Sequence, residues 1–277
     1  MSLIIGIDMG ISSTKIIGIE NGKRIKTPMT VKGSDEISSL YGALGKYLHT
    51  NDIPLEGVEH IMITGVGAKS VNTPILGCPT SMVDEFTANG LGARFDSGLD
   101  HMIVVSMGTG TSLVQVDGDE IKHIGGIGMG GGTLQGLSRL LLQTSDIEEV
   151  SALAEFGFPE NINLRIKDIC NDDIDGLIGD ATASLFAKVL QRSPDRNDIA
   201  AGLIHMVLET IGSSAVLSQL NGGYKDFVLI GNLTQLQLCK NVFPLLEQLY
   251  NVHFHIPKFA YYCTALGAAL SHGYENE

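Results

Sequence analysis

The most constraining feature of the sequence is a short pattern that occurs twice, about 100 residues apart. In each copy an apolar segment typical of a β-strand ends in a turn rich in Gly, Ser and Thr, and a second strand follows. The first copy spans residues 3–31 and contains "DMGISSTK", and the second spans 101–124 and contains "SMGTGTS". Repetition of one supersecondary unit indicates a duplicated fold. The pattern therefore predicts two α/β units with a cleft between them.

The rest of the sequence alternates between helical and strand patterns. Asn21-Gly22 predicts a hairpin turn into a third strand over 24–31. Apolar spacing then predicts a helix over 34–49, a strand over 60–67, and a helix over 81–95 for which Ser81 is a possible cap. After the second copy we expect strands over 226–232 and 251–256, and helices over 133–143, 199–220, 234–249 (interrupted by Pro244) and 263–274. This order predicts an α/β fold.

The segment "GGIGMGGGTLQG" from Gly125 to Gly136 contains seven glycines in twelve residues. Such a density is costly in a strand or a helix, because glycine loses backbone entropy without adding side-chain contacts. We therefore expect a loop whose bare backbone approaches a ligand. A helix expected from about Thr133 would add its N-terminus, which favours phosphate groups. The segment lacks the Lys of a Walker motif. A flexible lid without ligand contacts is the alternative.

The two turns offer the same chemistry. Their backbone N–H groups and hydroxyls can form concave anion sites, and Lys15 adds a positive charge. One such turn is ordinary, but two that face a single cleft predict a phosphate-bearing ligand.

A kinase would also need a group that accepts a hydroxyl proton. Asp84 and Glu85 are adjacent at a helix start, so one should point into the cleft, unless the pair only complements the helix dipole.

Composition limits the partners and the compartment. The net charge of −13 argues against a nucleic-acid partner, although it permits a small phosphorylated ligand. Residues 3–7 are too short for a signal peptide, and no segment approaches the ~20 apolar residues that cross a bilayer. We expect a cytoplasmic protein with no membrane partner. The four cysteines form no C-x-x-C pair, so we expect buried thiols rather than a metal site.

Several segments resemble a known family when they are taken together. In chain order they are "IDMGISSTK", "VDEF", "MGTGTSL", "GGIGMGGGTLQGL", "GDATASLFAKVL", "IGN" and "ALGAAL". They resemble the actin, sugar-kinase and heat-shock chaperone superfamily, and within it the type II pantothenate kinases. The resemblance implies two ribonuclease-H-like lobes, 1–96 and 97–277, that hold ATP between them. It also implies phosphorylation of pantothenate, the first step of coenzyme A biosynthesis, by a homodimer joined through the helix at 199–220.

The resemblance also implies the roles of individual residues. Glu85 would be the catalytic base, Asp8 would orient Mg²⁺ or its waters, and residues 229–232 would border the adenosine. His123 and Thr111 would lie at the substrate. The residues implied at the nucleotide are Asp8, Gly10, Ser12, Lys15, Gly108, Thr109, Gly110, Thr111, Gly126, Gly130, Gly131, Gly132, Thr133, Gly231 and Asn232.

The sequence departs from the family pattern in three places, mainly on the acceptor side. His123 stands where the family usually has Arg, and it lacks the bidentate guanidinium fork. Ile11 and Ser12 replace a Gly-Thr pair, and Thr87 replaces an Asp. Two alternatives therefore stay open. One is a kinase for another small hydroxyl compound, such as a sugar, and the other is a nucleotide-binding activator or non-catalytic homologue.

Overall fold

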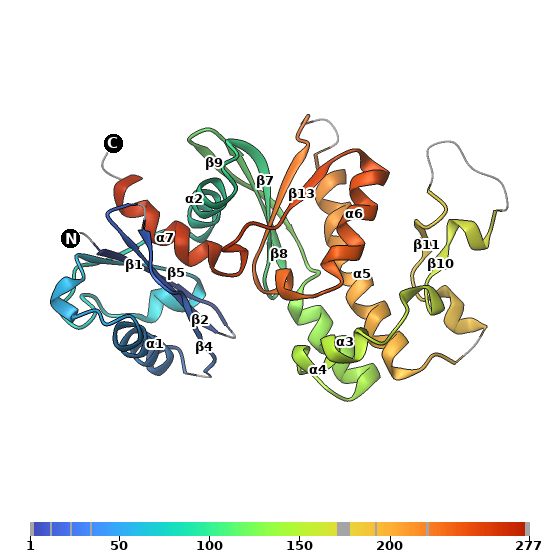
Figure 1. Ribbon diagram of the computed structural model, residues 1–277, viewed down its shortest axis with the longest axis horizontal. Helices are drawn as coiled ribbons and strands as arrows, with labels where there is room; N and C mark the ends of the chain where they lie inside the picture. The colour runs from blue at the N-terminus through green and yellow to red at the C-terminus, as the bar shows by residue number, and fades with distance from the viewer. Residues whose placement is uncertain are drawn as a thin grey trace.

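The computed structural model of the chain describes residues 3–274, except 12, 23, 34, 171–177, 192, 220 and 221. It contains two large β-sheets, each with its own helices, arranged side by side along the molecule (Figure 1). The predicted α/β fold class is confirmed. Ser12, one of the residues expected at the nucleotide, lies outside the described residues.

The first sheet has the strand order β3-β2-β1-β5-β6, with β4 paired to β2. β1 and β2 are antiparallel, whereas β1, β5 and β6 run parallel. Asn21 and Gly22 both have positive φ, as a two-residue hairpin turn requires. The third strand expected over 24–31 is divided into two short strands. The strands are β1 (Leu3–Met9), β2 (Thr14–Glu20), β3 (Arg24–Ile25), β4 (Met29–Val31), β5 (His60–Thr64) and β6 (Thr80–Met82).

The second sheet repeats this topology. Its order is β13-β12-β7-β8-β9, in which β7, β8 and β9 form an antiparallel meander and β7, β12 and β13 are parallel. The predicted internal repeat is therefore present as a repeated strand order. The strands are β7 (His101–Met107), β8 (Thr111–Asp117), β9 (Glu120–Ile127), β12 (Asp226–Ile230) and β13 (His253–His255).

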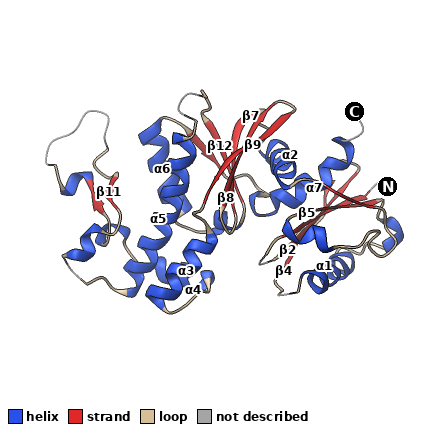
Figure 2. Cartoon of the chain, turned by 180° about the vertical axis from the view of Figure 1, so that it is seen from behind, coloured by secondary structure: helices blue, strands red, loops and turns tan. Residues whose placement is uncertain are grey.

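The helices cover both sheets. They are α1 (Glu36–Thr50), α2 (Glu85–Ser97), α3 (Gly131–Leu142), α4 (Ile147–Ala154), α5 (Arg196–Leu217), α6 (Cys239–Tyr250) and α7 (Cys263–Tyr274). Figure 2 shows α5 and α6 on one side of the second sheet and α2 on the other. Side chains of β7 alternate accordingly: Ile103 and Val105 pack into the core with α5, whereas Met102 and Val104 pack into the core with α2.

Two expected helix details are wrong. Ser81 does not cap α2, because it lies in β6 beside Met62. The helix begins at Glu85, and the Asp84 carboxylate caps it by accepting the N–H groups of Phe86 and Thr87. Pro244 also does not interrupt α6, which runs through it. The buried face of α6 packs in the apolar core that it shares with α5 and the second sheet. This packing offsets the loss of the one helical hydrogen bond that proline removes.

The last helix, α7, packs against the first sheet although it ends the chain. Its alanines share a core with Ile4 and Ile17 of the first sheet. Glycines allow α7 to approach both β1 and α2 closely: a Cβ at Gly6 would lie 1.9 Å from the Ala265 carbonyl oxygen, and one at Gly267 would lie 1.7 Å from that of Ala88 in α2. The division into 1–96 and 97–277 stays a prediction. The structure adds that α7 contributes to the core of the first lobe.

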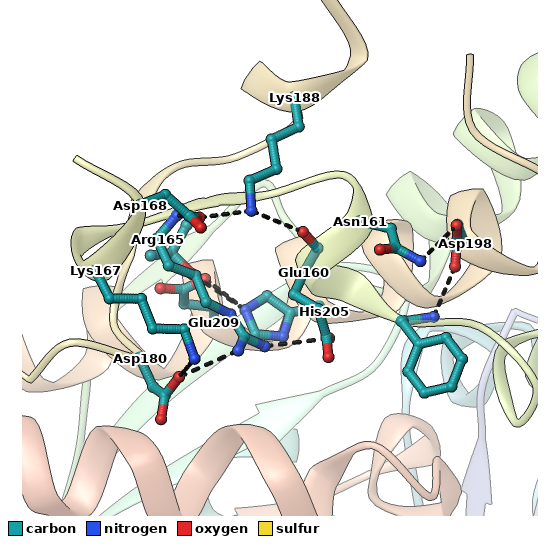
Figure 3. A network of polar contacts seen from close by, with 12 residues as sticks. Glu160, Asn161, Arg165, Lys167, Asp168, Asp180, Lys188, Asp198, His205 and Glu209 are labelled. Atoms are coloured by element: carbon teal, nitrogen blue, oxygen red, sulfur yellow. Dashed lines mark hydrogen bonds and ion pairs between the residues drawn. The ribbon is translucent and has the colours of Figure 1, made fainter. Parts of the chain in front are cut away.

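Helix α5 is long and apolar enough to cross a membrane, but 61% of its apolar window is buried inside the molecule. A core helix that is mostly buried passes the same test of length and hydropathy. A small sheet of β10 (Leu164–Arg165) and β11 (Thr182–Ser184) extends beyond α5. Beside this small sheet, the Arg165 guanidinium forms ion pairs with the carboxylates of Glu160 at 3.2 Å and Asp180 at 3.1 Å (Figure 3).

Candidate active site

A cavity of about 530 Å³ is lined by residues of both lobes. Both Gly/Ser/Thr turns contribute to it, as do the first turn of α2 and the segment after β12. The cavity lining includes the following residues that the sequence placed at the site: Asp8, Gly10, Lys15, Glu85, Gly108, Thr109, Gly110, Thr111, Gly126, Gly231 and Asn232.

Strand direction explains why these residues meet. Asp8 lies at the end of β1, Gly65 directly follows β5, and Glu85 follows β6. These three strands are parallel neighbours, so their carboxyl ends lie at one edge of the first sheet. In the second sheet Gly108 and Gly231 follow β7 and β12 in the same way. Each lobe therefore presents the carboxyl ends of its strands to one cavity.

The Asp8 carboxylate is buried beside the Lys15 ammonium. Lys15 is its partner across β1 and β2, and the Lys15 Nζ lies 3.8 Å from Asp8 Oδ2. The same Nζ lies 4.7 Å from the ring centre of Tyr261. Burial raises the pKa of the Asp8 carboxyl, and the positive charge of Lys15 opposes this rise. Lys15 thus carries positive charge at a point where phosphate oxygens can approach.

The structure distinguishes the two adjacent carboxylates at the start of α2. Asp84 is exposed and caps the helix, whereas Glu85 is half-buried and lines the cavity. Burial raises the pKa of Glu85, the negative charges of Asp8 and Asp84 raise it further, and Lys15 opposes them. A carboxylate with a raised pKa accepts a proton more readily near neutral pH. Glu85 therefore lies in the cavity with a raised pKa, and its role as a general base stays a prediction.

The glycine-rich segment packs behind the second turn. The N–H groups of Gly131 and Gly132 donate to the carbonyl oxygens of Gly108 and Thr109, both at 2.8 Å. A Cβ at Gly130 would lie only 2.5 Å from the Thr109 oxygen. Of the segment, Gly126 and Ile127 belong to the cavity lining, whereas residues 130–133 do not. Their contact with a nucleotide stays a prediction, and their observed role is to support the turn.

One hydroxyl hydrogen bond joins this segment to the same turn, and another closes the segment on itself. The Thr111 hydroxyl donates to the Met129 carbonyl oxygen at 2.8 Å, and the Thr133 hydroxyl donates to that of Gly128 at 3.1 Å. Helix α3 begins at Gly131, two residues before the expected Thr133. The turn, the loop and the N-terminus of α3 therefore form one packed unit.

His123 lies at the rim. It is exposed on β9, and its ring stacks on Phe86 with a centroid distance of 3.9 Å and an interplanar angle of 13°. Phe86 lines the cavity, but His123 does not. The substrate role expected of His123 stays a prediction, and its observed contact is with the residue that follows Glu85.

Several lining residues were missed from the sequence. Ser106 holds the position in "SMG" that Asp8 holds in "DMG", so the repeat contained a signal for it. Thr264 also lines the cavity, and its hydroxyl donates to Asn89 Oδ1 at 2.7 Å. That bond joins α7 to α2 one turn after Glu85, and no local pattern indicates it. The other missed residues are Ile11, Gly65, Val66, Phe86 and Ile127, whereas Ser13 and Ser112 belong to the two turns that were expected to bind phosphate.

Comparisons with known proteins agree with this geometry. The solved activator of the 2-hydroxyisocaproyl-CoA dehydratase from Clostridium difficile with bound ADPNP is similar over 99% of this chain and 95% of its own, with a TM-score of 0.69 and 16% identity. A ROK family glucokinase from Streptomyces griseus in complex with glucose and AMPPNP covers 96% and 98%, with a TM-score of 0.58 and 13% identity. These likenesses confirm the two-lobe actin-like fold.

Sequence comparisons are more specific. A family model described as Fumble matches residues 94–242. A protein of Staphylococcus haemolyticus named type II pantothenate kinase is 31% identical over 239 residues, which cover 82% of this chain and 84% of the relative. The matched length is greater than that of either lobe, so the match extends into both. By this extent and identity, the chain belongs to the type II pantothenate kinase family.

Proposed function

We propose that this chain is an ATP-dependent kinase that phosphorylates the primary hydroxyl group of pantothenate, the first step of coenzyme A biosynthesis. The observation that carries the proposal is the position of Glu85. Its half-buried carboxylate, with a raised pKa, lines the same cavity as two glycine turns. Relatives that match 82% of the chain are named type II pantothenate kinases. The product would be 4′-phosphopantothenate.

The two turns fit the phosphates of ATP, which supplies the phosphoryl group. A Cβ at Gly108 would meet only the Gly110 carbonyl oxygen, at 3.7 Å, so glycine leaves cavity space beside the backbone. Lys15 supplies positive charge at the first turn. At the other end, the Asn232 side-chain oxygen is buried without a hydrogen-bond partner, which suits a polar group of the nucleoside.

Asp8 fits an Mg²⁺ ion that is held mainly by the nucleotide. Among the described residues, no group of three or more His, Cys, Asp and Glu side chains could hold a metal. Mg²⁺ in kinases is usually bound through one or two carboxylates, substrate phosphates and water. The Asp8 carboxylate is oriented by Lys15 and lines the cavity. It would hold the ion or its waters, and the ion would neutralise phosphate charge.

Glu85 would then act on the acceptor. Its carboxylate accepts the proton of the primary hydroxyl while the hydroxyl oxygen bonds to the γ-phosphorus. The bond from that phosphorus to the β,γ-bridging oxygen breaks, and ADP leaves with the bond's electrons. Glu85 afterwards returns the proton to solvent. Phosphoryl transfer needs mainly positioning and charge stabilisation. The turns, Lys15 and Asp8 would provide these, and Glu85 would add proton transfer.

An acceptor panel tests the proposal. ADP release and product mass are measured with pantothenate, pantetheine and glucose. We expect acceptor-dependent turnover with pantothenate, and a loss of about 10²–10⁴-fold in Glu85→Gln with ATP affinity retained. Glu59→Gln is the matched control, because Glu59 is exposed before β5, at the opposite end of that strand from the cavity. Turnover of the sugar alone, or nucleotide binding without any turnover, would contradict the proposal.

The cellular compartment and the oligomeric state are further parts of this proposal, and both rest on the family. A pantothenate kinase would work in the cytoplasm, where ATP is supplied. The homodimer expected through α5 is tested by the mass of the protein in solution. Because most of the apolar surface of α5 is buried within its own chain, a dimer would use the remaining half-exposed positions.

A further inference from the structure

Three apolar side chains gather around the cavity on the side of Glu85. Ile11 is 69% exposed and Val66 is 61% exposed, and both line the cavity together with Phe86. A single exposed apolar side chain is ordinary, but several at the mouth of one cavity indicate a ligand with hydrocarbon surface.

The fold explains why the three residues lie together. Ile11 follows β1, Val66 follows β5, and Phe86 lies in the first turn of α2 after β6. The three strands are parallel neighbours. The loop after β5 packs directly against the end of β1, because a Cβ at Gly65 would lie 2.9 Å from Asp8 Oδ1. The short segment between β6 and α2 is held beside β5, because the Val83 N–H donates to the Ile63 carbonyl oxygen at 3.0 Å.

This arrangement places apolar side-chain surface next to Glu85, the proposed base. Phe86 directly follows Glu85 in α2, and the His123 ring stacks on Phe86 and supports it from the rim. A sugar hydroxyl flanked by further hydroxyls would lose hydrogen bonds to water against such a surface. A hydroxyl flanked by methyl groups would bury them there at a gain.

Pantothenate has this chemistry, since the carbon next to its hydroxymethyl group bears two methyl groups. We infer that Ile11, Val66 and Phe86 form an apolar wall that contacts these geminal methyl groups and selects the acceptor. The inference rests on the proposed function. It assigns substrate selectivity to three side chains that take no part in proton transfer or phosphate binding.

A cycle of two acceptors and three variants tests the wall. The acceptors are pantothenate and its analogue in which both geminal methyl groups are hydrogen. The variants are Ile11→Ala, Val66→Ala and the double variant, and the readout is the ratio of kcat/KM for the two acceptors. This ratio cancels changes in active fraction and in ATP binding. Ile37→Ala is the control, because Ile37 is an exposed apolar residue of the same lobe outside the cavity lining.

We expect the wild type and Ile37→Ala to prefer pantothenate by about tenfold or more. Each wall variant should reduce the preference several-fold, and the double variant should nearly abolish it. If the variants turn over pantothenate with an unchanged ratio of kcat/KM for the two acceptors, the inference about the wall is wrong and the proposed function stands. The same holds if the wild type shows no preference for pantothenate. Binding of ATP with no turnover of either acceptor would instead overturn the proposed function, and the wall with it.

Discussion

Replacing Gly130 by alanine tests whether the glycine-rich segment supports the second turn. Gly130 has an extended φ of 177°, which any residue can adopt, so backbone strain is not the issue. The issue is space, because the new Cβ would lie 2.5 Å from the Thr109 carbonyl oxygen and 2.7 Å from the Gly110 Cα. Ordinary contact begins at 3.4 Å, so the turn or the helix must move by 3.4 − 2.5 = 0.9 Å.

That movement sets the expected magnitude. Overpacking of this kind typically costs about 1–3 kcal/mol of stability. It would also lengthen the two 2.8 Å hydrogen bonds from Gly131 and Gly132 to the turn. A displacement of about 1 Å at a positioning element can cost up to about 10²-fold in turnover. We therefore expect Gly130→Ala to lower both the free energy of unfolding and kcat/KM for ATP.

The same segment supplies a control. A Cβ at Gly128 would meet nothing within 4 Å, so Gly128→Ala should change neither quantity appreciably. Stability is measured by urea unfolding, and kcat/KM by the rate of ADP release with ATP as the varied substrate. Equal behaviour of the two variants would refute the reasoning, because it would show that close packing against the turn is not why glycine is needed.

Three further predictions concern the charges around the cavity. Asp84→Asn keeps a capping oxygen but removes a charge that raises the pKa of Glu85, so the acid limb of the kcat/KM profile should move to lower pH; an unmoved limb would contradict this coupling. Burial makes Glu85 bind its proton more tightly in the folded chain than in the unfolded chain, so the free energy of unfolding falls as pH rises through the raised pKa. Glu85→Gln should therefore have a higher Tm than wild type at neutral pH, and the difference in Tm should vanish below the ordinary pKa of 4.5. Equal Tm values at every pH would show that the buried charge of Glu85 does not destabilise the fold. Tyr261→Leu removes the ring beneath the Lys15 ammonium and should raise KM for ATP several-fold, whereas Tyr261→Phe should not; equal KM values would remove Tyr261 from Lys15 positioning.

Patterns between near neighbours were readable in the sequence. The alternation of strands and the positive-φ Asn21-Gly22 turn depend on residues close together in the chain, and the structure contains both. The bounds of α7, residues 263–274, were also predicted, since an apolar helix rich in alanine has few alternatives. The repeated "DMG" and "SMG" turns indicated one cavity, and both line it.

Other features could not be read because their partners lie far apart in the chain. The acidic pair at 84 and 85 has two valid local interpretations, and only the direction of α2 against the first sheet assigns the cap to Asp84 and the cavity to Glu85. The Thr264–Asn89 hydrogen bond joins residues 175 positions apart. The apolar wall likewise depends on strand order, because β1 and β5 are neighbours and the residues that follow them, Ile11 and Val66, line one cavity.

The sequence by itself determined the repeated strand–turn–strand unit, the chemistry of the turns and the family, because these depend on residue types in short segments. Only the tertiary structure decided what the glycines of residues 125–136 contact. Their density indicated a need for bare backbone, but a local pattern cannot distinguish a ligand from another part of the chain. The packing of α3 shows that Gly131 and Gly132 contact the second turn, since their N–H groups donate to Gly108 and Thr109, whereas their contact with a nucleotide stays a prediction.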